Sequence, residues 1–231
     1  MQSGVVIELG TIEYRKALDM QQTLCFKRGY DQMPDTLLLL EHPHVFTLGR
    51  GTDPAHLFID RPAALALGAD IIQADRGGSV TYHGPGQLIG YPILDLGLSP
   101  DLHQYLRDLE EVLIRTLKNF NIAADRFPGL TGVWVNGAKI ASIGVKVTRG
   151  ITKHGFSLNI DPQMNFFNYI NACGFNRSHV SMRQLLGEPI SANLVKSALV
   201  KSFEVVFEHP MIFNSEERLE QLNPSFPLGS A

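Results

Sequence analysis

The sequence predicts an α/β (α+β) fold, a single domain arranged around a mixed or antiparallel sheet. Strand-like and helical segments interleave irregularly along the 231 residues. Residues 132–160 alternate as strands and contain two turn signals, Asn136-Gly137 and Arg149-Gly150, which are typical of hairpins. The chain is 44% hydrophobic and 19% charged, which is ordinary for a globular protein that buries a core. One domain over residues 1–231 is therefore expected.

The pattern predicts strands at residues 4–9, 36–40, 45–48 and 87–93, and helices at about residues 11–27, 99–120 and 191–207. Thr11 and Ser191 are the expected caps of the first and last helices. Ser99-Pro100 would start the second helix, with proline at its first position and a long apolar stripe after it. The tail from about residue 214 to 231 contains proline and glycine and is predicted to be loose.

Several classes of protein are disfavoured by composition. No apolar run approaches the ~20 residues of a membrane helix, and no secretory signal is visible at the N-terminus. The two cysteines, Cys25 and Cys173, lie far apart and are expected to be reduced. Cys25 falls on an apolar helix face and is interpreted as a small core residue. Without CxxC or HExxH spacing, no metal site is expected, and His42 with His44 is interpreted as part of a turn. These features predict a cytoplasmic protein that binds no membrane.

Charge is distributed unevenly along the chain. The formal net charge is −3, yet Asp161 is the one acidic residue between Arg126 and Gly187, a stretch that holds seven lysines and arginines. Such a stretch favours an acidic partner that meets one face of the protein. Alternatively, the cations protect strand edges against aggregation. The sequence leaves both interpretations open.

The most informative segment is residues 76–88, which read RGGSVTYHGPGQL. Its four glycines suit a main chain that takes positive φ or approaches a ligand closely. It is not a P-loop, because no lysine follows the glycines, and it lacks the spacing of a dinucleotide fingerprint. A Gly/Pro-rich hairpin without a ligand is the alternative interpretation.

Three further segments carry candidate chemistry. Lys139 lies in GAKIASIGV (137–145), residues 154–159 read HGFSLN, and Cys173 lies in ACGF (172–175). A lysine among small and apolar residues either extends its charge to solvent or has a function. Cys173 lies outside any periodic pattern, so it is either a nucleophile or a buried inert thiol.

Together these motifs resemble the lipoyl(octanoyl) transferase family. Residues 76–88 match its RGG-x-x-T-[YF]-HGPGQ signature almost completely, and GAKIASIG, HG-x-x-LN and ACG follow in the family's order. The resemblance spans about residues 37–188. It implies a catalytic domain related to those of biotin ligases and lipoate ligases. It also implies an acyltransferase that moves an octanoyl or lipoyl group from acyl carrier protein to a specific lysine of a lipoyl domain, the first step of protein lipoylation.

The resemblance further implies partners and site residues. The donor would be octanoyl-acyl carrier protein. The acceptors would be lipoyl domains of 2-oxoacid dehydrogenase E2 subunits and the glycine cleavage H protein, with no cofactor and no nucleic acid. Cys173 would carry the acyl group as a thioester, and Lys139 would lower the pKa of its thiol. The residues implied to bind the acyl substrate are Arg76, Gly77, Gly78, Ser79, Val80, Thr81, Tyr82, His83, Ser142, Ile143, Gly144, Gly155, Phe156 and Ser157.

Elementary chemistry is consistent with this assignment. A free thiol near pKa 8.5 is only a few per cent ionised at neutral pH, and a nearby ammonium favours the thiolate. The neutral form of Lys139 could later accept a proton from the acceptor amine. His83 is either a donor that polarises the acyl carbonyl or a residue that orients the turn.

Three alternatives belong to other functional classes. An ATP-dependent lipoate or biotin-protein ligase would share the fold but would not need Cys173. A cysteine acyl-thioester hydrolase would need a histidine base, and His179 is close in sequence. A non-catalytic module that binds carrier protein would leave both Lys139 and Cys173 unexplained.

Overall fold

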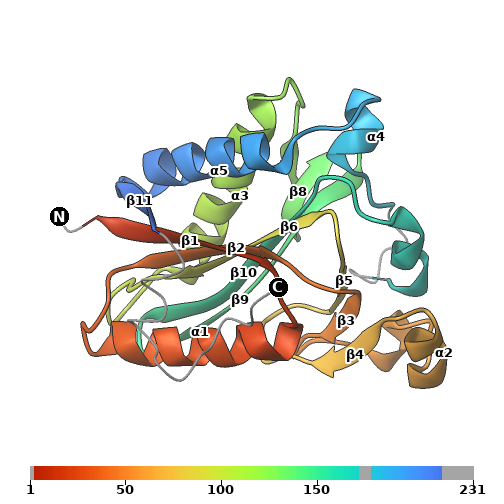
Figure 1. Ribbon diagram of the computed structural model, residues 1–231, viewed down its shortest axis with the longest axis horizontal. Coiled ribbons are helices and arrows are strands. Elements are labelled where there is room, and N and C mark those ends of the chain that lie inside the picture. Colours follow the sequence, from red (N-terminus) through yellow and green to blue (C-terminus); the bar gives the residue numbers. More distant parts are fainter. Residues whose placement is uncertain (1–2, 172–177, 215–231) are drawn as a thin grey trace.

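The computed structural model describes residues 3–171 and 178–214 and contains a large mixed sheet with helices on both faces (Figure 1). Its eight strands run in the order β11-β1-β2-β6-β10-β9-β8-β7. Their bounds are β1 Gly4–Thr11, β2 Thr36–Glu41, β6 Gln87–Ile93, β7 Asp125–Phe127, β8 Leu130–Val135, β9 Ala138–Thr148, β10 Ile151–Asn159 and β11 Met211–Asn214. Strand β1 is parallel to β2 and to β11, and the other neighbours are antiparallel, so the predicted mixed sheet is confirmed.

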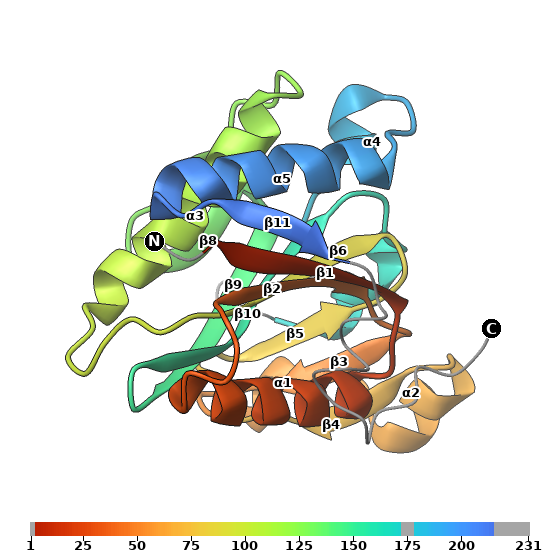
Figure 2. The same ribbon diagram turned by 60° about the vertical axis from the view of Figure 1, so that its left-hand side comes forward.

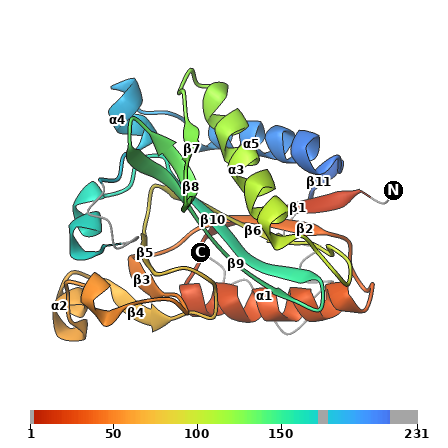
Figure 3. The same ribbon diagram turned by 180° about the vertical axis from the view of Figure 1, so that it is seen from behind.

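Two helices cover one face of this sheet and one helix covers the other. Helices α3 (Leu102–Lys118) and α5 (Ala192–Phe207) lie together above it in Figure 1, and Figure 3 shows α3 across β8 to β10. Their apolar faces join the inner side chains of the sheet in the main core, in which Leu109, Leu199 and Phe203 are fully buried. Helix α1 (Tyr14–Gly29) covers the opposite face, where Ala17 and Leu24 pack in a separate core (Figure 2). Because both faces of the large sheet are covered by helices, its middle strands carry apolar side chains on both sides.

A smaller sheet lies beside the large one, near the start of α1 (Figure 1). It has the order β4-β3-β5, with β3 Val45–Leu48, β4 Asp70–Gln73 and β5 Val80–His83. The short helices η1 (Pro54–His56), α2 (Arg61–Ala66) and η2 (Met164–Tyr169) surround it, and α4 (Met182–Leu186) precedes α5. Phe46, Tyr82 and Phe166 form its aromatic core. This sheet was not predicted as a separate unit, because its strands have only four residues each and their partners are distant in sequence.

Both predicted turn signals close hairpins. Asn136 and Gly137 have φ of 50° and 80°, and Arg149 and Gly150 have φ of 52° and 83°. Positive φ at both central residues is the hallmark of a type I′ turn, whose twist matches that of paired strands. The second turn fixes the β9–β10 register over eight residue pairs, and the candidate site is built on this register.

The starts of two helices differ from the predictions. The prediction that Thr11 caps the first helix is wrong, because Thr11 ends β1 and Glu13 precedes the helix. The prediction that Pro100 occupies the first position of the second helix is also wrong. Asp101 is the cap, and its carboxylate accepts the Gln104 N–H at 3.0 Å. A carboxylate at this position accepts a hydrogen bond from a free N–H of the first turn, and its negative charge interacts favourably with the helix dipole. This stabilisation outweighs the preference for proline at the first helical position. Ser191 does occupy the cap position before α5, as predicted, but its side chain makes no capping hydrogen bond.

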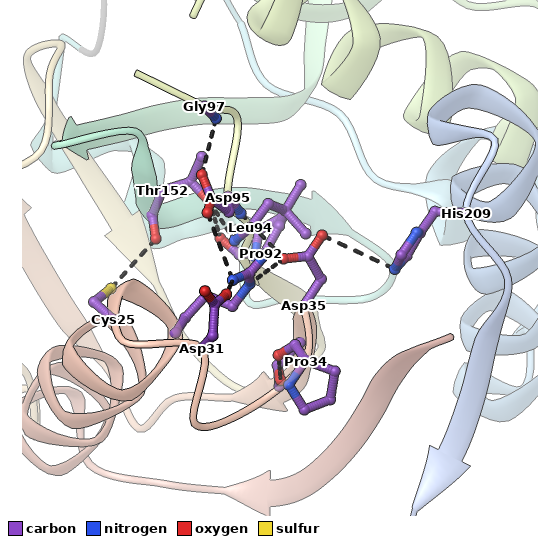
Figure 4. Close-up of polar contacts among 12 residues, drawn as sticks. Cys25, Asp31, Pro34, Asp35, Pro92, Leu94, Asp95, Gly97, Thr152 and His209 are labelled. Carbon is purple, nitrogen blue, oxygen red and sulfur yellow. Dashed lines mark hydrogen bonds and ion pairs between the residues drawn. The ribbon is translucent and has the colours of Figure 1, made fainter. Parts of the chain in front are cut away.

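Cys25 lies on α1 and packs at the edge of the second core. Its Sγ donates a hydrogen bond to the Thr152 carbonyl on β10 at 3.3 Å, and Figure 4 shows the sulfur directed at that oxygen. Burial raises the pKa of this thiol to about 11. The interpretation of Cys25 as a small core residue agrees with these contacts. None of the helices in the described part of the chain combines the length and apolarity needed to cross a bilayer.

Candidate active site

A cavity of about 210 Å³ lies where the β9–β10 hairpin meets the glycine-rich segment that leads into β5. The cavity is lined by Tyr14, Arg76, Gly78, Ser79, Val80, Thr81, His83, Tyr91, Gly129, Leu130, Thr131, Lys139, Ser142, Ile143, Gly144, His154, Gly155, Phe156 and Ser157. The structure therefore brings together twelve of the fourteen predicted substrate-binding residues and Lys139. Their role in binding stays a prediction.

Small residues on two adjacent strands line the floor of the cavity. Ser142 pairs with Ser157 and Gly144 pairs with Gly155, so these four residues lie on one face of the sheet. We call Ser142, Gly144, Gly155 and Ser157 the small-residue track. The intervening Ile143 and Phe156 contribute their side chains to the main core beneath it. A Cβ on Gly144 would lie 3.0 Å from Arg76 Cδ and 3.1 Å from the Gly77 carbonyl, and one on Gly155 would meet Pro92 of β6 at 2.6 Å. The two glycines therefore let neighbouring segments pack closely on the strands, and the cavity opens beside them.

Arg76 shapes the glycine-rich segment rather than pairing with an acid. Its Nη1 donates to the carbonyls of Gly77 (3.1 Å) and Ser79 (2.8 Å), and its Nη2 donates to the Thr47 carbonyl and hydroxyl, both at 2.7 Å. The guanidinium is buried, and this burial lowers the pKa of Arg76. Four neutral acceptors keep the loop folded against β3.

Gly77 and Tyr82 do not line the cavity. The Gly77 N–H donates to the Val145 carbonyl at 2.9 Å and ties the segment to β9. Tyr82 is fully buried in the small sheet, stacks on Phe166 with ring centroids 4.9 Å apart and hydrogen-bonds His44 at 2.7 Å. Side chains alternate along a strand, so Thr81 and His83 face the cavity while Tyr82 faces away from it.

The hydrogen bonds of His83 determine its tautomer. Gln87 Nε2 donates to the Tyr82 carbonyl and to Asn159 Oδ1, which fixes Gln87 Oε1 as an acceptor. His83 Nδ1 lies 3.2 Å from Gln87 Oε1 and must therefore carry the proton. Burial, together with the neighbouring His42 and Arg76, lowers the pKa of His83 well below its ordinary value, so the ring is neutral. Its Nε2 is then an acceptor, which does not suit the predicted role of a donor to the acyl carbonyl.

Lys139 reaches the cavity from an irregular part of β9. The β8–β9 register shifts between Val133 and Trp134, and this shift lets Lys139 and Ser142 both line the cavity although they are an odd number of positions, three, apart. The Lys139 side chain is buried, and its Nζ lies 4.9 Å from the centroid of the Trp134 ring. Gly132 makes room for it, since a Cβ there would lie 2.7 Å from Lys139 Cε. The ammonium is thus held within a partly apolar wall, where its charge is screened less than it would be in water.

Cys173 lies outside the described residues, but the residues on either side of its segment are linked to the cavity walls, one directly and one through His56. Asn171 donates its N–H to the His56 carbonyl at 2.8 Å, and the His56 ring hydrogen-bonds the Ser79 hydroxyl at 3.1 Å. On the other flank, the Lys139 N–H donates to the Ser178 carbonyl at 2.9 Å. Ser79 and Lys139 both line the cavity.

His179, a candidate base in the hydrolase alternative, is a poor acceptor of protons. Its ring stacks on Phe167 with centroids 4.1 Å apart. Burial, and then the charge of Lys139, lowers the pKa of His179 to about 3. A base this weak is far from the near-neutral pKa that general-base catalysis favours.

Six residues that line the cavity were not predicted from the sequence, namely Tyr14, Tyr91, Gly129, Leu130, Thr131 and His154, and Asp75 beside them was not predicted either. Tyr14 and Tyr91 line the cavity from α1 and β6, which no short motif connects to it. His154 lines it too, and its Nε2 donates to Asp75 Oδ1 at 2.6 Å. Asp75 Oδ2 also accepts from Lys146 at 2.9 Å and from Lys153 at 2.7 Å. The position of His154 directly before Gly155 in the HG motif was a signal that could have identified it.

Burial and hydrogen bonding oppose each other at Asp75. Partial burial alone would raise the pKa of Asp75, but the bonds from Lys153, His154 and Lys146 outweigh it and hold the pKa well below its ordinary range. Burial lowers the pKa of His154 to about 4 despite the carboxylate. Asp75 is therefore charged and His154 neutral at neutral pH, which fixes the proton on Nε2.

Comparison with known proteins identifies a family. The model of the lipoyl protein ligase A/B catalytic domain matches residues 13–204. An octanoyltransferase of Gloeobacter violaceus is 46% identical over 205 residues, which cover 88% of this chain and 90% of that protein. An octanoyltransferase of Rubrobacter xylanophilus is 45% identical over 204 residues, with 87% and 92% covered.

Solved structures share the fold at low sequence identity. A putative lipoate protein ligase from T. acidophilum with bound lipoic acid has a TM-score of 0.73 at 14% identity, with 96% of this chain and 93% of that chain covered. A biotin protein ligase from Aquifex aeolicus in complex with biotin and ATP has a TM-score of 0.53 at 11% identity, with 90% and 71% covered. The predicted fold class, including its relation to lipoate and biotin ligases, is confirmed.

Proposed function

The chain belongs to the lipoyl protein ligase A/B catalytic domain family, and on this basis we propose that it is an octanoyltransferase of protein lipoylation. The octanoyl donor is acyl carrier protein, and the acceptors are lysines of lipoyl domains in 2-oxoacid dehydrogenase E2 subunits and in the glycine cleavage H protein. Residues 1–231 act as one catalytic domain. The cytoplasmic location stays a prediction from the sequence.

A single observation carries this proposal. The buried ammonium of Lys139 lies at a cavity that the small-residue track also lines, and the residues that flank Cys173 are hydrogen-bonded to the same walls, Ser178 directly and Asn171 through His56. A thiol, a cation and a narrow cavity for an extended chain are the parts that acyl transfer between thioesters requires.

The first half-reaction forms a thioester on Cys173. The Cys173 thiolate, stabilised by the Lys139 ammonium, attacks the carbonyl carbon of the octanoyl carrier thioester. The carbon–sulfur bond to the carrier breaks, and the carrier thiolate takes a proton from Lys139. One thioester replaces another, so this exchange costs little free energy.

The second half-reaction forms the amide. The amine of the acceptor lysine attacks the Cys173 thioester, and neutral Lys139 takes a proton from the attacking nitrogen. The carbon–sulfur bond breaks and regenerates the thiolate beside the Lys139 ammonium. The octanoyl amide is released, and no cofactor takes part.

Intact mass measurement tests the proposal. The protein is mixed with octanoyl carrier protein in the absence of ATP, with or without a lipoyl domain. We expect a gain of one octanoyl group on the enzyme, which transfers to the lipoyl domain when that is added. No adduct and no transfer, combined with transfer from free octanoate and ATP, would establish the ligase alternative.

The structure separates the basic residues that the sequence placed in one stretch. Arg126 pairs with Glu110 at 3.1 Å and with Glu111 at 2.8 Å, while Lys146 and Lys153 pair with Asp75. Arg149 is exposed, but it lies at the hairpin turn, and β9 extends roughly 30 Å from Lys139 to that turn. These residues therefore do not form a single basic face around the cavity.

From this distribution we expect charge reversal at Arg149 to have little effect on the carrier. Arg149→Glu should change KM for octanoyl carrier protein less than twofold, because screening limits its influence to about 8 Å at physiological ionic strength. Lys118→Glu, on the helix α3 across the sheet, is the matched control. A severalfold rise in KM for Arg149→Glu, without a rise for Lys118→Glu, would instead support a basic face on which the acidic carrier protein docks.

A further inference from the structure

A second cavity lies beyond the first along the same strands. It measures about 450 Å³ and is lined by α1 and by the end of the β9–β10 hairpin, with Cys25, Phe26 and Ile151 as its apolar residues. Lys146 and Lys153 also line it. Phe26 is 62% exposed, so this cavity opens at the surface of the protein.

A cluster of ionic hydrogen bonds separates the two cavities. His154 lines the first cavity, Lys146 and Lys153 line the second, and Asp75 bonds to all three. We call Asp75, Lys146, Lys153 and His154 the ion cluster. The main chain at Gly77 also crosses β9 here, where its N–H donates to the Val145 carbonyl at 2.9 Å. The partition therefore combines this short backbone crossing with side chains held by one carboxylate.

The register of the sheet aligns this cluster with the small-residue track. On the cavity face, the pair Ser142–Ser157 is followed by Gly144–Gly155 and then by Lys146–Lys153. Strand β9 advances about 13 Å from Ser142 to Lys146. An extended octanoyl chain measures roughly 9 Å from its carbonyl carbon to its methyl group, for staggered bonds of about 1.5 Å. A chain with its carbonyl near Lys139 and Ser142 thus ends before the lysine pair.

The backbone of His154 is held in an unusual conformation at this position. Its φ of 60° is left-handed, which is uncommon for a residue other than glycine. The conformation directs its N–H to Gln21 Oε1 at 2.7 Å, while its ring bonds to Asp75. A strained backbone conformation that surrounding contacts maintain is typical of residues at functional sites.

We propose that the ion cluster is the end wall of the acyl cavity and sets the upper limit of acyl chain length. This inference rests on the proposed octanoyl transfer. A longer chain would have to push its methyl end among Asp75, Lys146 and Lys153, separating charged groups from their partners in a partly dry environment. The apolar residues of the second cavity would accept such a chain only after the cluster opens.

The unmodified protein provides the first test. Transfer to a lipoyl domain is measured with carrier proteins bearing acyl chains of eight to sixteen carbons. In an open channel each added methylene would strengthen binding about fourfold. We expect instead that kcat/KM falls at least about tenfold between the eight-carbon and fourteen-carbon donors. Equal or rising efficiency at fourteen carbons would overturn the proposal.

Two variants test the cluster itself. His154→Gly removes the ring at a left-handed position that glycine adopts without strain, and Asp75→Ala removes the central carboxylate. Each should raise the ratio of fourteen-carbon to eight-carbon kcat/KM at least about tenfold, as two or more further methylenes gain contacts. The control is Glu8→Ala, which removes a carboxylate of similar exposure that pairs with Lys196 (side chains of Glu8 and Asp75 are 40% and 37% exposed).

The outcomes distinguish this inference from the proposed function. Octanoyl transfer by the unmodified protein with no change of the ratio in either folded variant would refute the end wall and leave the function intact. Absence of octanoyl transfer by the unmodified protein would refute the function. Thermal melting establishes that each variant is folded, and the chain-length profile of the unmodified protein decides the matter if both variants fail to fold.

Discussion

Replacement of Cys173 by alanine is expected to reduce octanoyl transfer at least about a thousandfold. Loss of a covalent nucleophile removes the whole two-step route, and substrate binding alone supports only slow residual transfer. The rate is measured with octanoyl carrier protein and a lipoyl domain, and the mass adduct on the enzyme should disappear with it.

Cys25→Ala is the matched control for this variant. The Cys25 thiol donates to the Thr152 carbonyl, and its pKa of about 11 keeps it protonated at neutral pH. We expect nearly full activity, with a modest loss of stability from the smaller side chain. Full turnover by Cys173→Ala would eliminate the thioester mechanism.

Replacement of Lys139 by methionine is expected to lower kcat about a hundredfold or more, within the range for a positioned acid–base group. Methionine has a similar length and keeps the contact with Trp134, so the change isolates the charge. Removal of a nearby ammonium destabilises the thiolate, and the pKa of Cys173 should therefore rise.

The alkylation rate of Cys173 with iodoacetamide, followed against pH, measures this effect. Its midpoint should move upward by about one unit or more, where one unit corresponds to about 1.4 kcal/mol. Lys196→Met, which removes a lysine that pairs with Glu8, should leave the midpoint unchanged. An unshifted profile in Lys139→Met would mean that Lys139 acts through substrate contacts or packing.

Much of this protein was determined by local sequence. The Asn136-Gly137 and Arg149-Gly150 turns, confirmed by positive φ at all four residues, require nothing beyond two residues and their conformational preferences. The long helices and the strands of the sheet followed from hydrophobic periodicity, which depends on residues three or four positions apart in helices and two apart in strands. Lys139 and most of the residues predicted to bind substrate line one cavity, and local sequence could group them because they lie within contiguous motifs.

Other features depend on contacts between distant segments. Only the sheet register places Tyr14, Tyr91 and His154 around one cavity, because they come from α1, β6 and β10. Tyr82 and His83 are adjacent in the motif, yet strand alternation sends one to an aromatic core and the other to the cavity. Only a network through Gln87 and Asn159 decides which nitrogen of His83 carries the proton. Asp75 bonds to Lys146 and Lys153, which lie more than seventy residues further along the chain, and only tertiary packing brings these three side chains together.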